Sequence, residues 1–167
     1  NRVPKMRDET FIFCLNHVNV NTEKKVILEL GTSRSFVDGR FPGCNSDDPK
    51  YWEPNNPEKW DWSAGCFTRF FAEHSNKTNQ IITVDIDWRH INRCKLMTKD
   101  FSNINYVVSS SEEVLSKMPP SSIDLLYLDT GDMTPIEQTA QLHLREAKLI
   151  IERNILKDDG IILIDDV

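Results

Sequence analysis

Residues 26–35 read VILELGTSRS, an apolar run that ends in an acid and is followed directly by Gly31-Thr32-Ser33. An uninterrupted run of Val, Ile and Leu is typical of a strand buried on both faces of a parallel sheet. In open sheets of this kind, ligands bind beyond the carboxyl ends of the strands. We therefore expect this strand to deliver its carboxyl end to a ligand.

Three later segments repeat the pattern of an apolar run that finishes on carboxylates. They read IITVDID (residues 81–87), IDLLYLD (residues 123–129) and GIILIDD (residues 160–166). A single Asp after a strand is commonly a helix cap or a turn former, whereas four such strands in register place acids along one rim. The repetition therefore favours a ligand site at the carboxyl edge of a sheet.

Helical patterns lie between these strands. Apolar residues at helical spacing predict helices over residues 8–20, 63–72, 88–99, 111–117 and 135–154, with a short strand over residues 104–108. Ser63 would cap the second of these helices, and its Phe67, Phe70 and Phe71 would pack on the sheet. The alternation predicts an α/β, Rossmann-like, doubly wound and mainly parallel sheet with helices on both faces.

The last helix and the last strand carry two further expectations. The helix over residues 135–154 would place an apolar side on the sheet, made of Leu142, Leu144, Ala147, Leu149 and Ile150. The segment Asp158-Asp159-Gly160 would form the turn into the last strand. Residues 36–62 break the alternation with Gly, Pro, Asn and Asp and hold three of the four Trp, so we expect an insertion there.

Composition indicates one domain over residues 1–167, since 39% hydrophobic and 28% charged residues are ordinary for a globular chain. A net charge of -6 argues against a nucleic-acid partner, which favours a basic face. No segment has the pattern of a signal peptide or a membrane span. The cysteines at 14, 44, 66 and 94 form no C-x-x-C pair, so we expect reduced thiols and a cytoplasmic location. The oligomeric state stays open.

The four strand ends, taken in order, carry a resemblance to a known family. Glu29-Leu30-Gly31, Val84-Asp85, Leu128-Asp129 and Ile164-Asp165-Asp166 resemble the motifs of class I S-adenosylmethionine-dependent methyltransferases, and among them the metal-dependent O-methyltransferases. The resemblance covers residues 23–167 except the insertion. In that family the sheet continues with a helix and an antiparallel hairpin, so we expect its C-terminal strands to be missing from this chain.

The resemblance implies a set of cofactor-binding residues. Glu29 and the backbone of Gly31, Thr32 and Ser33 would hold the methionine part of S-adenosylmethionine, with Gly31 permitting close approach. Asp85 would accept hydrogen bonds from both ribose hydroxyls, with Ile86 beside it. The adenine would be bordered by Ser110, Ser111 and Glu112. The alternative for these serines is simple helix capping.

The resemblance also implies a metal site at Asp129, Asp165 and Asp166. Three aspartates at these positions are similar to the macrocin and mycinamicin type of sugar O-methyltransferase. Converging carboxylates repel one another unless a cation neutralises them, and oxygen ligands select magnesium or manganese over zinc. The alternative is that Asp165 and Asp166 turn the chain while Asp129 caps a loop.

The catalytic base would be a carboxylate. Catechol-type relatives place a lysine three residues after the first metal aspartate, where this chain has Asp132, so Asp129 or Asp132 is the candidate. His143 is a further candidate, although a lone helical histidine is more often a packing residue. The aromatic and polar residues at positions 51–62 suit stacking on sugar rings, or else cover the edge of the sheet.

These expectations add up to an S-adenosylmethionine-dependent O-methyltransferase that acts on a hydroxyl of a sugar or glycan with a divalent cation. A phenol or catechol acceptor is the alternative within this class. A nicotinamide-dependent oxidoreductase expects G-x-G-x-x-G after the first strand, whereas residues 31–36 hold a single glycine. A binding domain without turnover is a further alternative.

Overall fold

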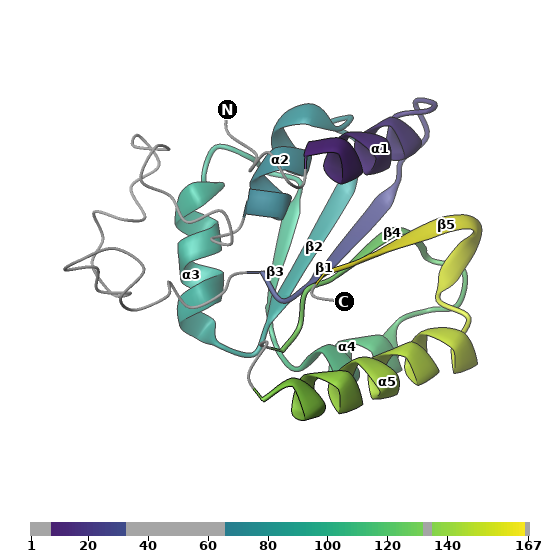
Figure 1. The fold of residues 1–167 in the computed structure, drawn as a ribbon. Helices are drawn as coiled ribbons and strands as arrows, with labels where there is room; N and C mark the ends of the chain where they lie inside the picture. Colours follow the sequence, from purple (N-terminus) through teal and green to yellow (C-terminus); the bar gives the residue numbers. More distant parts are fainter. Residues whose placement is uncertain (1–7, 33–65, 132–134, 166–167) are drawn as a thin grey trace.

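The computed structural model describes residues 8–32, 66–131 and 135–165. Within them, five strands form one parallel sheet in the order β3-β2-β1-β4-β5 (Figure 1). The strands are β1 (Val26–Leu30), β2 (Gln80–Asp85), β3 (Ile104–Val108), β4 (Ile123–Leu128) and β5 (Leu156–Ile164). The helices are α1 (Asp8–Val18), α2 (Cys66–His74), α3 (Trp88–Met97), α4 (Ser111–Lys117) and α5 (Ile136–Glu152). The predicted α/β Rossmann-like fold is confirmed.

Some of the residues to which the sequence assigns a role lie outside the described part of the chain. They are Ser33, the insertion at 36–62 with its aromatic segment at 51–62, the expected cap Ser63, and the two aspartates Asp132 and Asp166. Among the helices that the structure describes, none combines the length and the apolar character needed to cross a bilayer.

The strand order reverses between β1 and β4, the central pair of the sheet. From β1 the chain proceeds outward to β2 and β3, and then returns to β4 on the other side of β1 (Figure 1). Such a reversal opens a crevice at the carboxyl ends of the two central strands, which is where α/β sheets of this type bind ligands. The fold therefore directs attention to the ends of β1 and β4.

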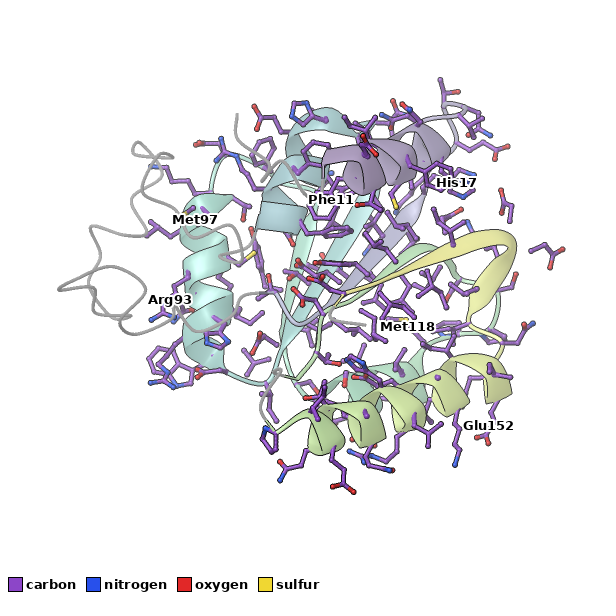
Figure 2. The ribbon with its side chains drawn as sticks, in the orientation of Figure 1. Phe11, His17, Arg93, Met97, Met118 and Glu152 are labelled. Atoms are coloured by element: carbon purple, nitrogen blue, oxygen red, sulfur yellow. The ribbon has the colours of Figure 1, made fainter. Side chains whose placement is uncertain are left out.

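Two apolar cores lie on opposite faces of the sheet. Helices α1 and α2 cover one face and α4 and α5 the other (Figure 1). Figure 2 shows Phe11 between α1 and the sheet, where it meets the ring of Tyr127 edge-on at 5.8 Å. Phe67 stacks on the same Tyr127 ring at 4.4 Å. The ring of Tyr127 is thus fixed by packing, as expected for a buried aromatic cluster.

The last strand differs from the prediction. It begins at Leu156 rather than at Gly160, and Asp158-Asp159-Gly160 lie within it, at a bulge or irregularity in its pairing with β4. Opposite this bulge, β4 advances only from Ile123 to Leu125 while β5 advances from Leu156 to Ile161. Gly160 is required there, because an added Cβ would stand 2.9 Å from the carbonyl oxygen of Ile123. Bulge residues and turn residues have the same character in a sequence.

The apolar side of α5 also differs in part. Ile150 is buried as predicted, whereas Leu144 is 49% exposed and does not belong to that side. In its place the fully buried residue in the middle of the helix is an acid, Glu146. Glu146 lies one helical turn before Ile150 and therefore shares its face.

Candidate functional site

The hydrogen-bond ladder of the sheet continues one residue past the strand ends. Gly31 N donates to Val84 O at 2.8 Å, Asp129 N to Leu30 O at 2.9 Å, and Asp165 N to Leu128 O at 3.0 Å. Together with the pairing of Asp85 with Val108, this register forms one row across the sheet, made of Val108, Asp85, Gly31, Asp129 and Asp165. Below we call these five residues the edge row. Three of the acids that the sequence predicted at this edge, Asp85, Asp129 and Asp165, therefore lie in one row.

Gly31 occupies the centre of the edge row in a left-handed conformation, with φ +88°. An added Cβ would lie 2.0 Å from the carbonyl oxygen of Asp129. The sequence predicted that Gly31 lets a ligand approach the backbone. In the structure, the group that occupies the space beside Gly31 is the backbone of Asp129. Gly31 therefore allows β1 and β4 to meet at the reversal of strand order.

Glu29 lies below the edge row, inside the protein. It is 1% exposed, and its Oε2 accepts hydrogen bonds from the hydroxyls of Thr68 and Thr83, both at 2.5 Å. Burial raises the pKa of the Glu29 carboxyl to about 7, and the hydroxyls of Thr68, Thr83 and Thr32 offset part of that rise. Glu29 of β1 is thus linked to α2 through Thr68 and to β2 through Thr83.

Asp85 is 8% exposed and anchors the loops around it. Its Oδ2 accepts from Thr32 N at 3.2 Å, and its Oδ1 accepts from Asp87 N at 2.8 Å and lies 3.1 Å from His90 Nδ1. A carboxylate offers about four acceptor positions, so these contacts leave room for one more donor. To accept hydrogen bonds from two ribose hydroxyls, Asp85 would therefore have to lose one of its three present contacts.

Next to Asp85, the structure describes apolar groups in solvent and one buried hydroxyl. Ile86 is 76% exposed, Trp88 62% and Val108 53%. Thr32 is buried; its Oγ1 makes no hydrogen bond of good geometry among the described residues, but it lies near the Glu29 carboxyl and lowers the pKa of that group. The sequence prediction included Thr32 and Ile86 but missed Trp88 and Val108. Their position directly after β2 and at the end of β3 was the available signal.

The serines before α4 serve the helix. Ser110 is the N-cap and accepts from Glu113 N at 3.2 Å, while Ser109 donates to Glu113 Oε2 at 2.9 Å. Ser111 is buried and its hydroxyl donates to Glu146 of α5. Capping, the alternative role for these residues, is therefore present in the structure.

Asp129 and Asp165 converge on the hydroxyl of Tyr127. This hydroxyl donates to Asp165 Oδ2 at 2.9 Å and lies 3.4 Å from Asp129 Oδ2. Because packing fixes the ring of Tyr127, the hydroxyl holds a defined place between the two carboxylates. In the described part of the chain no three His, Cys, Asp or Glu side chains form a cluster that could hold a metal ion. The third predicted ligand, Asp166, falls beyond that part.

His143, the additional candidate for the base, faces a backbone carbonyl. Its Nε2 lies 2.7 Å from Thr130 O. A carbonyl oxygen only accepts, so this nitrogen carries the proton and donates it. His143 therefore braces the loop that follows Asp129.

Comparison with known proteins gives a structural likeness without a sequence match. No family model matches the chain, and no curated protein is similar to it in sequence. An rRNA methylase from Streptococcus thermophilus superposes with a TM-score of 0.58 at 11% identity, over 98% of this chain and 72% of that protein. A methyltransferase from Geobacter sulfurreducens gives 0.56 at 12% identity, over 94% of this chain and 59% of that protein.

A third similar structure contains a ligand. The N-methyltransferase NodS from Bradyrhizobium japonicum, solved in complex with S-adenosylhomocysteine, gives a TM-score of 0.53 at 17% identity over 98% of this chain. The chain spans 66% of the length of NodS and less than two thirds of the Geobacter protein. At these identities the likeness shows the fold, which is that of class I methyltransferases.

Proposed function

We propose that this chain is the S-adenosylmethionine-binding domain of a methyltransferase. The observation that carries the proposal is the edge row, which places Asp85 on one side of Gly31 and the pair Asp129 and Asp165 on the other. The methyltransferase fold, and the S-adenosylhomocysteine bound in NodS, support it. S-adenosylmethionine supplies an electrophilic methyl group on a positively charged sulfur, and carboxylates nearby favour such a cation.

The β2 and β3 ends of the edge row suit the adenosine part of this ligand. Asp85 has acceptor capacity for a ribose hydroxyl, and the exposed side chains of Ile86, Trp88 and Val108 offer apolar cover for a base.

The β4 and β5 ends suit the acceptor. Asp129 and Asp165 approach one phenolic oxygen, and with Asp166 they would hold magnesium or manganese, the cations that oxygen ligands favour. Such a cation would lower the pKa of a bound hydroxyl. Asp129, or Asp132 in the following loop, would then take the hydroxyl proton. The acceptor we propose is a sugar hydroxyl, with a phenol or catechol as the alternative.

Calorimetric titration tests the donor side. We expect S-adenosylhomocysteine to bind and NAD not to bind, because the first loop lacks the second and third glycines of a dinucleotide fingerprint. Asp85→Asn should weaken S-adenosylhomocysteine by about tenfold or more, since a buried acceptor is lost. Asp159→Asn, an exposed acid at the bulge of β5, is the control and should bind normally. Binding of NAD in place of S-adenosylhomocysteine would refute the proposal.

The acceptor side is tested by transfer of a labelled methyl group to a panel of glycans, catechols and RNA. RNA is included because the Streptococcus protein of the same fold is an rRNA methylase. Asp129→Asn and Asp165→Asn should each lower metal-stimulated transfer by about 100-fold while leaving S-adenosylhomocysteine affinity within about tenfold. Full activity in excess chelator would contradict the proposed role of a metal ion. Methyl transfer to RNA alone would contradict a sugar as the acceptor.

A further inference from the structure

Glu146 is a buried carboxylate to which the proposed chemistry assigns no role. It has no exposed surface and lies on the sheet-facing side of α5, one turn before Ile150. Glu152, labelled in Figure 2 at the last position of the same helix, is exposed by contrast. A buried acid is costly unless hydrogen bonds compensate it, so its contacts indicate what it is for.

The start of α4 and the loop after β4 meet at this carboxylate. The hydroxyl of Ser111, the first residue of α4, donates to Oε1. The hydroxyl of Thr130, from the loop after β4, lies 2.8 Å from both oxygens. Burial raises the pKa of Glu146, and the two hydroxyls counteract part of this effect. The carboxylate is thus the shared partner of Ser111 and Thr130.

Thr130 is held a second time by the same helix. His143, three residues before Glu146, donates from Nε2 to Thr130 O at 2.7 Å. Both the side chain and the carbonyl of the residue after Asp129 are therefore fixed to α5. Among the described residues, Glu112 also acts on Glu146 by raising its pKa, and Glu112 is itself paired with Arg145 at 2.9 Å.

We propose that Glu146 is a positioning residue that fixes the loop of Asp129 relative to the turn of Ser110 and Ser111. This inference rests on the proposed function, which places the acceptor at Asp129 and the base of the adenosine beside Val108, two residues before Ser110. One carboxylate then sets the spacing between the two halves of the ligand site. Methyl transfer depends on such spacing, because a misplacement of about 1 Å of the reacting groups costs about 100-fold in rate.

The first test is hydrogen exchange of residues 109–113 and 129–131 in the protein without ligand. Ser111→Ala removes one of the hydroxyls and touches only the first segment. If Glu146 links the two, exchange should become about tenfold faster in both segments, while β2 stays protected. Glu146→Ala should do the same more strongly, and Glu146→Gln should restore protection, because its amide both accepts and donates. Glu152→Gln is the matched control and should change nothing.

Two results would overturn the proposal. One is faster exchange that stays confined to residues 109–113 in Ser111→Ala, and the other is a Glu146→Gln variant that behaves like Glu146→Ala. Calorimetry with S-adenosylhomocysteine adds the link to function, with affinity expected to fall about tenfold in Glu146→Ala and to recover in Glu146→Gln. If the natural chain does not bind this ligand, the proposed function fails, while the exchange experiment still decides the role of Glu146.

Discussion

Gly31 stands where β1 and β4 come together, and no other residue type fits there. Any side chain would meet the carbonyl of Asp129 and would also have to adopt φ +88°. We expect Gly31→Ala to lower the free energy of unfolding by at least about 2 kcal/mol, measured by urea denaturation. Gly131→Ala is the comparison, since it has a similar φ of +85° but meets only the side chain of Thr139. An equal loss of unfolding free energy in both variants would show that the left-handed φ alone, and not the contact with the Asp129 carbonyl, destabilises Gly31→Ala.

Glu29 makes a prediction about pH. Its pKa is raised from 4.5 to about 7, so the folded protein binds this proton more tightly than the unfolded chain does. The free energy of unfolding should therefore fall as the pH rises from 4.5 to about 7, by at most about 3 kcal/mol from this group, and change no further above that.

Replacement of Glu29 by Gln isolates that contribution. Gln keeps the shape and lacks the titration, so urea denaturation between about pH 5 and pH 8 should show a smaller fall than in the natural chain. Glu146, whose pKa is also raised, stays in place and accounts for the part of the fall that remains. An unchanged slope in Glu29→Gln would contradict the burial of a titrating carboxyl at this position.

At the scale of elements, Asp124 joins three strands at the amino edge of the sheet. This 2% exposed carboxylate accepts from Val26 N at 2.7 Å and from Lys157 Nζ at 2.8 Å, and lies 3.5 Å from Lys25 Nζ. Asp124→Ala should cost about 3–5 kcal/mol of unfolding free energy, because it leaves buried donors without an acceptor. Lys157→Ala, whose side chain is 33% exposed, should cost less than about 1 kcal/mol.

Urea denaturation of both variants checks this difference. Similar losses would mean that the ion pair with Lys157 matters more than the backbone bond to Val26. The bulge of β5 belongs to the same arrangement, since it is the segment that carries Lys157 to Asp124.

The sequence predicted elements well where pattern and capping agreed. The bounds of β3 and α4 were predicted to the residue, since apolar residues mark the strand and Ser110 caps the helix. The start of β5 was missed because a bulge and a turn use the same residues. Glu146 was missed although it recurs at helical spacing with Leu142 and Ile150, because an acid on an apolar face is usually assigned to the surface.

For the whole molecule, alternating strands and helices predicted a parallel sheet, and strand ends rich in acids predicted that acidic side chains lie along its carboxyl edge. The sequence placed Asp85, Asp129 and Asp165 at one edge, and the register brings them into one row. It did not foresee that Glu29 lies below that row, because an acid ending a buried strand has the same sequence pattern whichever face it takes. The two-residue period of a strand predicts that successive side chains point to opposite faces of the sheet. Which face Glu29 takes depends on its packing partners, such as Thr68.

The distance between Asp124 and the edge row has a practical consequence. Roughly 17 Å of extended chain lie between them, from the five residue steps that separate Asp124 from Asp129 at about 3.3 Å per residue. Substitutions that raise thermal stability are best sought around Asp124, because that end of the sheet lies far from the edge row. Conversely, loops at the opposite edge can be changed without disturbing the contacts of Asp124 with Lys25 and Lys157.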